Sequence, residues 1–433
     1  MAPATAGVAG SGLKTYRWSG KGARPAIPAG AKSLPAGFSE VTNSPIPTLP
    51  TAPPTASYGT TAPGQLTAPG QATASGPMTA AGTVTAAATG ATYDRWDATS
   101  CRAASAAGST SYGYVRNHFS WCQWATYTAM SWGGGAITGT LTWRMTTIGI
   151  NWQGVRRTAY DIYLDQLAGS DALANAYVGV SYGVWPANET PNASCNVQSG
   201  GGRADTVTGW KARSDAHYQM DLPQSASSVG PDKLDACFFG QAVAVWYLGA
   251  WNWAAPSQPN QGTWTRCDSA PYIQVGGVTY TSGCVFSYTN PFWTVSKTAD
   301  PRISESAQHW YDAFVYPGTT APTKLTKLIP GKYGTSNFMH RLYYNSTRIR
   351  ANGDAAKKTC DVYFPFQTGG TTKHDCDEIP FARTYEGASV GDNNYSAYPV
   401  LSTDNQLSGS FWGAWLSQDR ILDGDRFQIQ ITP

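Results

Sequence analysis

Charged side chains are scarce in this chain of 433 residues: they make up 13% of it, and the formal net charge is only +3. A surface that is basic throughout is therefore excluded, and a nucleic-acid site would have to be a local patch or use a bound cation. The chain also lacks the run of about eighteen apolar residues that a membrane-spanning helix needs. Residues 1–12 lack the basic start and long apolar stretch of a conventional signal peptide.

Closely paired cysteines are also missing, which argues against a structural zinc site because zinc clusters use ligands in CxxC-like pairs. The cysteine count is even, and neighbouring cysteines lie at separations that suit local bridges. Pairing in sequence order predicts four disulfides, although the sequence leaves other connectivities open: Cys101–Cys122, Cys195–Cys237, Cys267–Cys284 and Cys360–Cys376. Disulfides persist in oxidising compartments, so we expect a secreted protein.

What the chain has in abundance is aromatic and turn-forming residues, with 17 Trp, 24 Tyr, 46 Gly and 28 Pro. Runs of β-branched and aromatic residues at 139–145, 159–164, 176–184 and 242–248 alternate with turn-rich segments. This pattern is typical of an antiparallel sandwich or barrel. We therefore expect a mainly β chain with a β-sandwich-like domain over residues 93–262. Within it, residues 245–253 (VWYLGAWNW) are either a strand edge or a carbohydrate-binding platform.

The first 92 residues are dominated by Ala, Gly, Pro, Thr and Ser, and the stretch 61–90 has almost no charge and few large side chains. Such a composition cannot bury enough apolar surface to offset chain entropy. Residues 1–92 are therefore predicted to be a low-complexity linker, or an arm that becomes ordered on a partner.

A helical period appears at residues 300–314, where five apolar residues share one face and Ser304 is placed to cap the start. This helix is expected to open a C-terminal α+β domain over residues 300–433, after a disulfide-bridged connector at 263–299. A cysteine-framed strand at 360–366, a helix near 406–417 and a final strand at 426–431 (RFQIQI) are predicted to follow.

The densest group of ionisable residues lies at 374–378 (HDCDE), followed by Arg383 and Glu386. Asp375 and Asp377 occupy alternate positions of a strand and would share one face. Carboxylate oxygens suit magnesium, manganese or calcium, whereas the alternative is a solvated acidic turn. A second polar patch, Asp404-Asn405, precedes the last helix. Asp404 is a candidate N-cap of that helix, which would place Asn405 in the first turn, where its amide oxygen could reach a metal.

Together these segments resemble the NucA/NucB family of secreted deoxyribonucleases. The resemblance covers about 130 residues, because the helix at 304–314 is also similar to the segment that opens the family's domain, and the order and spacing of the motifs match from residue 360 to the end. It rests on residues 376–383 (CDEIPFAR), 384–388 (TYEGA), Asp404-Asn405, Gly409-Ser410 and 422–427 (LDGDRF). The sequence departs from the family pattern in having Ile379 where an aromatic residue is usual, and Ala388 where a second glycine is usual.

The resemblance implies a small ββα-metal nuclease domain with one divalent ion, Mg²⁺ or Mn²⁺. Asp377 or Glu378 would be the general base, Asn405 the metal ligand on the helix, and Glu386, Asp404 and Asp375 supporting ligands. Arg383 would hold the phosphate, and His374 is either an exposed residue or an alternative base. The other histidines, His118, His217, His309 and His340, are expected to be structural or exposed.

The sequence therefore predicts an exported, metal-dependent endonuclease that hydrolyses DNA. Its β-rich domain would serve delivery, anchoring or inhibition through a cell-surface, delivery-apparatus or inhibitor partner. The alternative is a cell-surface binding or structural protein whose nuclease-like end is degenerate.

Overall fold

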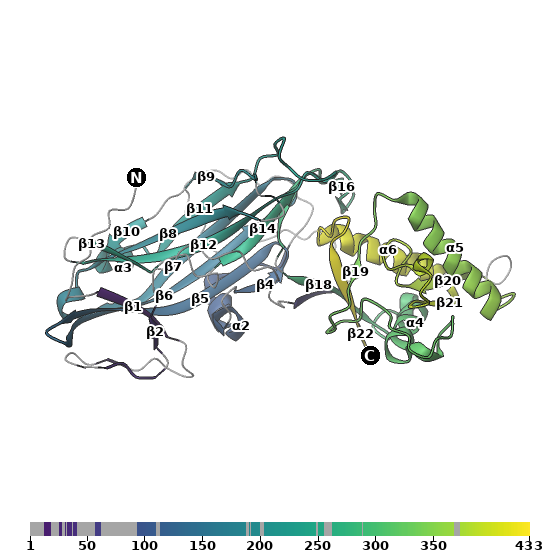
Figure 1. Cartoon of the computed structure of the whole chain (residues 1–433), viewed down its shortest axis with the longest axis horizontal. Helices are drawn as coiled ribbons and strands as arrows, with labels where there is room; N and C mark the ends of the chain where they lie inside the picture. Colours follow the sequence, from purple (N-terminus) through teal and green to yellow (C-terminus); the bar gives the residue numbers. More distant parts are fainter. Residues whose placement is uncertain are drawn as a thin grey trace.

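The computed structural model describes residues 93–433 apart from 110–112, 188–189, 191, 200–202, 248–249, 255–261, 288 and 368–372. It also describes residues 13–18, 26–27, 31, 33–36, 38–40 and 57–61. The chain forms a β-rich unit followed by a smaller C-terminal unit that carries the long helices (Figure 1). None of the described helices is both long and apolar enough to span a membrane.

The β-rich unit contains two large antiparallel sheets. One has the strand order β2-β1-β5-β6-β7-β11-β9, with β4 added on β5, and the other has the order β10-β8-β12-β14-β17, with β13 added on β12. The first sheet comprises β1 (Leu13–Trp18), β2 (Phe38–Glu40), β4 (Tyr114–Asn117), β5 (Ser120–Gly133), β6 (Ala136–Asn151), β7 (Arg157–Gly169), β9 (Asn196–Ser199) and β11 (Asp215–Asp221). The second comprises β8 (Tyr177–Pro186), β10 (Arg203–Thr206), β12 (Asp235–Tyr247), β13 (Ala250–Ala254), β14 (Gly262–Asp268) and β17 (Gly283–Phe286).

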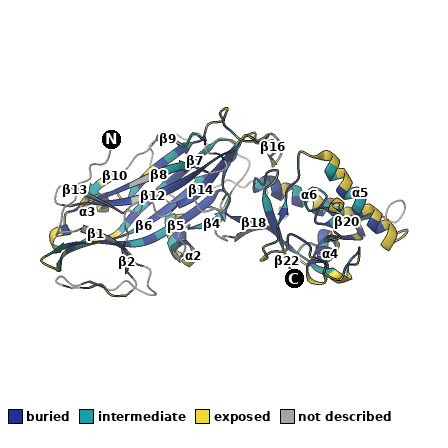
Figure 2. Cartoon of the chain, in the orientation of Figure 1, coloured by how far each residue is buried: buried dark blue, intermediate teal, exposed yellow. Residues whose placement is uncertain are grey.

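A single hydrophobic core joins these two sheets face to face. Trp121, Trp143 and Tyr160 from the first sheet pack with Val178 and Phe239 from the second, and all five are at most 1% exposed. Alternating burial along strands such as β7 is typical of a half-buried strand, and Figure 2 shows buried residues concentrated in the strands of both sheets. The predicted β-sandwich-like architecture is confirmed. Three short helices pack against it, α1 (Ala98–Ala103), α2 (Ser105–Ser109) and α3 (Val207–Ala212), and α3 contributes Val207 and Trp210 to the core.

Two sequence-based boundaries of the β-rich unit differ from the structure. Strand β1 pairs with β5, so part of the segment predicted as an arm belongs to the sandwich; residues 62–92 lie outside the described residues. The predicted connector at 263–299 is divided between sheets, because β14 and β17 complete the sandwich while β18 (Asn290–Ser296) joins the C-terminal unit. The small hairpin of β15 (Gln274–Val275) and β16 (Val278–Thr279) connects β14 to β17 along the chain.

The C-terminal unit is built on a sheet with the order β19-β22-β18-β3, in which β18 lies parallel to both β22 (Arg426–Thr432) and β3 (Ser57–Thr61). The remaining elements are β19 (Met339–His340), β20 (His374–Ile379) and β21 (Ser396–Leu401), with helices α4 (Ser304–Val315), α5 (Ser346–Tyr363) and α6 (Ser402–Gln418). Trp293, Trp310 and Trp415 meet in its core, from β18, α4 and α6. Strands β20 and β21 pair antiparallel, and α6 follows β21 directly.

Four local predictions in this unit are tested by the structure. The helices at 300–314 and near 406–417 and the strand at 426–431 are confirmed as α4, α6 and β22. The strand expected at 360–366 is wrong, because residues 346–363 form α5. The buried residues Asn352, Ala356 and Cys360 recur every four positions, which places them on one face of a helix.

All four predicted disulfides are present, and the described residues contain no free cysteine. The Cys360–Cys376 bridge links α5 to β20 immediately beside Asp377. It therefore anchors the strand that carries the acidic cluster against the long helix.

The two units are joined by a buried ion pair. Arg420, just after α6, is fully buried, and its Nε and Nη2 donate to the two carboxylate oxygens of Asp268 at 2.8 and 2.7 Å. Its Nη1 also donates to Gln153, from the β-rich unit. Gly283 permits this approach, since a Cβ there would lie 2.6 Å from the Arg420 guanidinium carbon. The β-rich unit is therefore in direct contact with the end of α6.

Candidate functional site

Two cavities flank strand β20, and the carboxylates lie in the smaller one. This carboxylate pocket has a volume of about 390 Å³ and is lined by Asp377 and Glu378 from β20, Asn405 from α6, and Arg341 and Arg383. Trp310, Phe381 and Trp412 supply apolar wall. Three separate chain segments thus bring two acids, an amide and two guanidinium groups around one space.

Both acids of the carboxylate pocket have raised pKa values. Burial is the main cause of the raised pKa of Asp377, whose side chain is 4% exposed. Burial and the charge of the neighbouring Asp377 raise the pKa of Glu378 to about 8. The backbone N–H of Ala382 donates a hydrogen bond to Glu378 and acts in the opposite direction, lowering this pKa. Paired carboxylates of this kind are common at functional sites, since a bound cation or proton relieves their repulsion.

Asp377 has a partner that the sequence did not reveal. His309 from α4 is 5% exposed; its Nδ1 lies 2.7 Å from Asp377 Oδ2, and its Nε2 lies 2.8 Å from Ser396 Oγ on β21. The imidazole is therefore held between two elements and fixes one carboxylate oxygen. The sequence analysis treated His309 as structural or exposed and did not anticipate this contact, because Asp377 lies 68 residues away along the chain.

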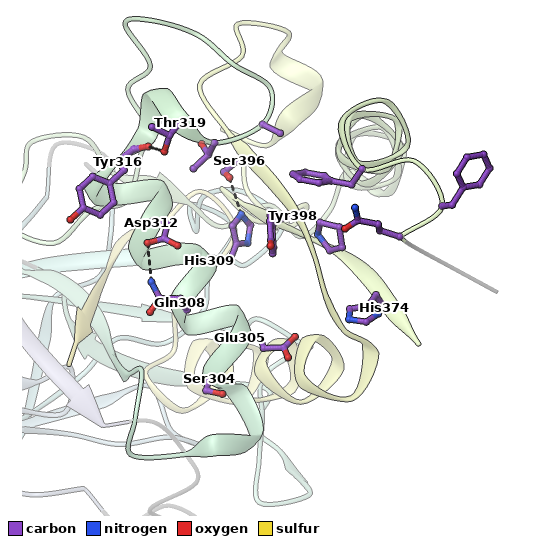
Figure 3. A pocket seen from close by; sticks show the side chains of 16 residues that line it. Ser304, Glu305, Gln308, His309, Asp312, Tyr316, Thr319, His374, Ser396 and Tyr398 are labelled. Atoms are coloured by element: carbon purple, nitrogen blue, oxygen red, sulfur yellow. Dashed lines mark hydrogen bonds between the residues drawn. The ribbon is translucent and has the colours of Figure 1, made fainter. Parts of the chain in front are cut away.

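On the other side of His309 is a larger cavity of about 1110 Å³, shown in Figure 3. His309 and Ser396 line it together with Glu305, Asp312, Tyr398 and His374. We take the smaller pocket as the candidate site, because both shifted carboxylates and the Arg341 and Arg383 guanidinium groups line it.

Four of the eight predicted site residues line the carboxylate pocket: Asp377, Glu378, Arg383 and Asn405. Asn405 is half-buried, and no hydrogen bond of its side-chain amide occurs within the described part of the chain. Arg341 was missed by the sequence analysis. It lies 42 residues before Arg383 and enters the pocket because β19 and the segment after it pack beside residues 383–385.

The structure places the other four predicted residues elsewhere. His374 lines the larger cavity, and Asp375 accepts hydrogen bonds from Ser402 and Gln406. Glu386 accepts from the backbone N–H of His340, and its Oε1 lies 2.7 Å from the His340 ring. None of these three lines the carboxylate pocket.

The contacts of Asp404 show that two predicted helix caps, Asp404 on α6 and Ser304 on α4, are wrong. The buried Asp404 carboxylate accepts from the backbone N–H groups of Glu305 and Ser306 at 2.8 and 3.1 Å. It therefore caps α4 rather than α6, and the expected cap by Ser304 is absent. Because α4 and α6 are packed together, a residue 99 positions away satisfies the first free amides of α4.

The oxygen donors of the carboxylate pocket decide whether a divalent ion could bind there. Among the described residues, no group of three or more His, Cys, Asp or Glu side chains is arranged to hold a metal. Two carboxylates and the Asn405 amide nevertheless provide oxygen atoms around one pocket. Mg²⁺ commonly binds through one or two carboxylates and completes its coordination with water and phosphate oxygens. The residues present fit that mode of binding.

Comparison with known proteins found no matching family model, no matching curated protein and no matching solved structure.

The raised pKa of Glu378 makes a prediction that is independent of any activity. In metal-free protein, Glu378→Gln is expected to increase the free energy of unfolding at pH 8 by on the order of 2 kcal/mol, and by much less at pH 5. Above its ordinary pKa of 4.5, the carboxyl ionises in the unfolded chain but stays protonated in the folded one until about pH 8. Stability is therefore lost as the pH rises through this window, and the uncharged amide removes that loss.

Chemical unfolding with chelator at pH 5 and pH 8 measures this difference. The amide retains the acceptor for the Ala382 N–H, so a loss of that bond does not confound the comparison. Equal differences between wild type and variant at the two pH values would show that Glu378 titrates normally.

Proposed function

We propose that the C-terminal unit is a divalent-metal-dependent endonuclease that hydrolyses DNA phosphodiester bonds, as in the NucA/NucB family that its sequence resembles. The observation that carries this proposal is the carboxylate pocket, where Asp377 and Glu378 from β20 face Asn405 from α6 and two arginines. The order β20, β21, α6, an antiparallel pair followed by a helix, agrees with the ββα arrangement that the resemblance implies.

Each group has a role in this reaction. Asp377, held by His309, accepts the proton of the attacking water. Arg383 is exposed at the pocket and can donate two hydrogen bonds to a phosphate, while Arg341 adds positive charge from the pocket wall. A divalent cation held by Glu378 and Asn405 would offset the charge that develops on the phosphate oxygens.

The proposal includes export, which the four disulfides support because such bridges persist in oxidising compartments. The β-rich unit would then serve delivery, anchoring or inhibition. If the full chain cuts no DNA, the alternative of a surface-binding protein with a degenerate nuclease-like end is favoured.

A second reaction type has one observation in its favour. Ser396, His309 and Asp377 form a chain of contacts in the order used by serine hydrolases. Ser396, however, is 0% exposed, so its hydroxyl cannot reach a substrate carbonyl in this conformation. The contact is better suited to holding His309 than to nucleophilic attack.

Metal dependence is the direct test of the proposed reaction. Plasmid nicking by the full chain is expected to disappear with excess chelator and to return with magnesium or manganese. Asn405→Ala should raise the magnesium concentration needed for half-maximal cleavage, because it removes one oxygen near the two acids. Thr403→Ala, an exposed change in the same helical turn, is the matched control and should leave that concentration unchanged. Nicking that continues undiminished in chelator would refute the metal-dependent mechanism.

A further inference from the structure

Beside the carboxylate pocket lies a second cavity, of about 490 Å³, that the proposed reaction does not use. It is lined by Tyr343, Tyr344, Ser346, Ile349, Arg350 and Arg383, and we call it the tyrosine groove. Arg383 also lines the carboxylate pocket, so it stands between the two cavities. A polymer bound at the carboxylates could therefore extend into the groove.

The charged residues that line the tyrosine groove favour an anion. Arg350 and Arg383 are exposed, and neither makes an ion pair within the residues that the structure describes. None of the six lining residues is acidic. Guanidinium groups that have no protein carboxylate to satisfy them are well placed to donate to phosphate oxygens.

The aromatic rings of the groove are held in fixed positions by the β-rich unit. Tyr272 stacks on Tyr343, with ring centroids 3.6 Å apart and planes at 19°. Asp232 accepts hydrogen bonds from the hydroxyls of both Tyr272 and Tyr344. Tyr344 lies edge-on to Tyr343 at 5.2 Å and is still 43% exposed. The groove thus presents an immobilised aromatic ring that is open to solvent.

Fixed aromatic rings beside unpaired arginines are what proteins use to bind single-stranded nucleic acid. Bases stack on the rings, and the backbone phosphates lie on the cations. A base within a duplex cannot stack in this way, because its faces are already covered by its neighbours.

We propose that the tyrosine groove binds an unpaired nucleotide of the DNA strand next to the bond that is cut. Its base stacks on Tyr344 and its phosphate contacts Arg350 and Arg383. The substrate class is therefore DNA that is single-stranded or locally unpaired near the cut. The β-rich unit contributes to this selectivity through Asp232 and Tyr272. This inference rests on the proposed nuclease function, but it can be tested without cleavage.

The test measures binding of fluorescently labelled oligodeoxynucleotides to the full chain in chelator, using a single strand and a hairpin duplex of equal length. Tyr344→Ala is expected to weaken binding of the single strand about tenfold and that of the duplex by less than about twofold. Tyr344→Phe keeps the ring but loses the bond to Asp232, and should weaken binding of the single strand roughly two- to threefold. Thermal unfolding of each variant confirms that the exposed substitution leaves the fold intact.

Arg350→Ala and Lys358→Ala form a matched pair, since both residues are exposed cations on α5. Only Arg350→Ala should weaken binding of the single strand and lower the salt dependence of that binding by about one phosphate contact. Equal losses for the two variants, or equal losses of single strand and duplex in Tyr344→Ala, would overturn the proposal. If wild type binds as expected but cuts no DNA, the groove stands and the nuclease assignment fails; if it cuts DNA and Tyr344→Ala binds normally, only the groove fails.

Discussion

Asp377→Asn and Glu378→Gln are each expected to lower DNA cleavage by at least about a hundredfold, the scale on which a positioned base or a charge-stabilising group contributes. Both substitutions keep the shape of the side chain and remove its charge. The amide oxygen introduced at position 377 can still contact His309, and the amide of the second variant can still accept from Ala382. The fold should therefore survive, which circular dichroism and thermal unfolding will check.

Two control variants separate the possible mechanisms in the same plasmid assay. His374→Ala should have a small effect, because His374 lines the larger cavity and not the carboxylate pocket. Ser396→Ala should also leave most of the cleavage, since the serine only supports His309. A loss in His374→Ala as large as in Asp377→Asn would identify the histidine as the base. Full cleavage by a folded double variant of the two acids would end the nuclease assignment to this pocket.

Asp268→Asn is expected to destabilise the protein by about 3–5 kcal/mol, because it leaves the fully buried Arg420 without its counter-charge. The loss should appear in chemical unfolding as an earlier midpoint. The matched control is Asp215→Asn, which removes the solvent-accessible partner of Arg213 at 3.8 Å and should cost about 0.5 kcal/mol or less. A change below about 1 kcal/mol in Asp268→Asn would show that water or movement of the two units compensates the arginine.

The parts of the fold that the sequence predicts are those in which local pattern and burial agree. Helix α4 is predictable because its apolar residues recur at helical spacing, and β22 because Phe427, Ile429 and Ile431 alternate. Helix α5 escapes prediction because its buried face consists of small and polar residues, Asn352, Ala356, Thr359 and Cys360. Because these residues are small or polar, the buried face of α5 is hardly more hydrophobic than its exposed face. The apolar residues at the end of the helix resemble those of a strand.

The candidate site is predictable only where its residues are close in sequence. Asp377, Glu378 and Arg383 belong to one segment, and Asn405 was suggested by its place at the start of the last helix and by the family resemblance. Arg341 and His309 reach the site through packing of distant elements, which no local pattern encodes. The contacts of Asp404 were missed for the same reason, since the free amides that its carboxylate satisfies belong to α4.

Strand β18 has a consequence for how this chain can be dissected. It lies between β22 and β3 and carries Trp293 into the core of the C-terminal unit, although the resemblance begins only near residue 300. A cut after residue 299 would remove the central strand β18 from this sheet, whereas a cut just before Asn290 would keep β18 and remove only the edge strand β3. Even then, the released fragment would carry Arg420 with its carboxylate left behind on the other piece. A C-terminal unit released in this way would therefore be less stable than the same unit within the intact chain.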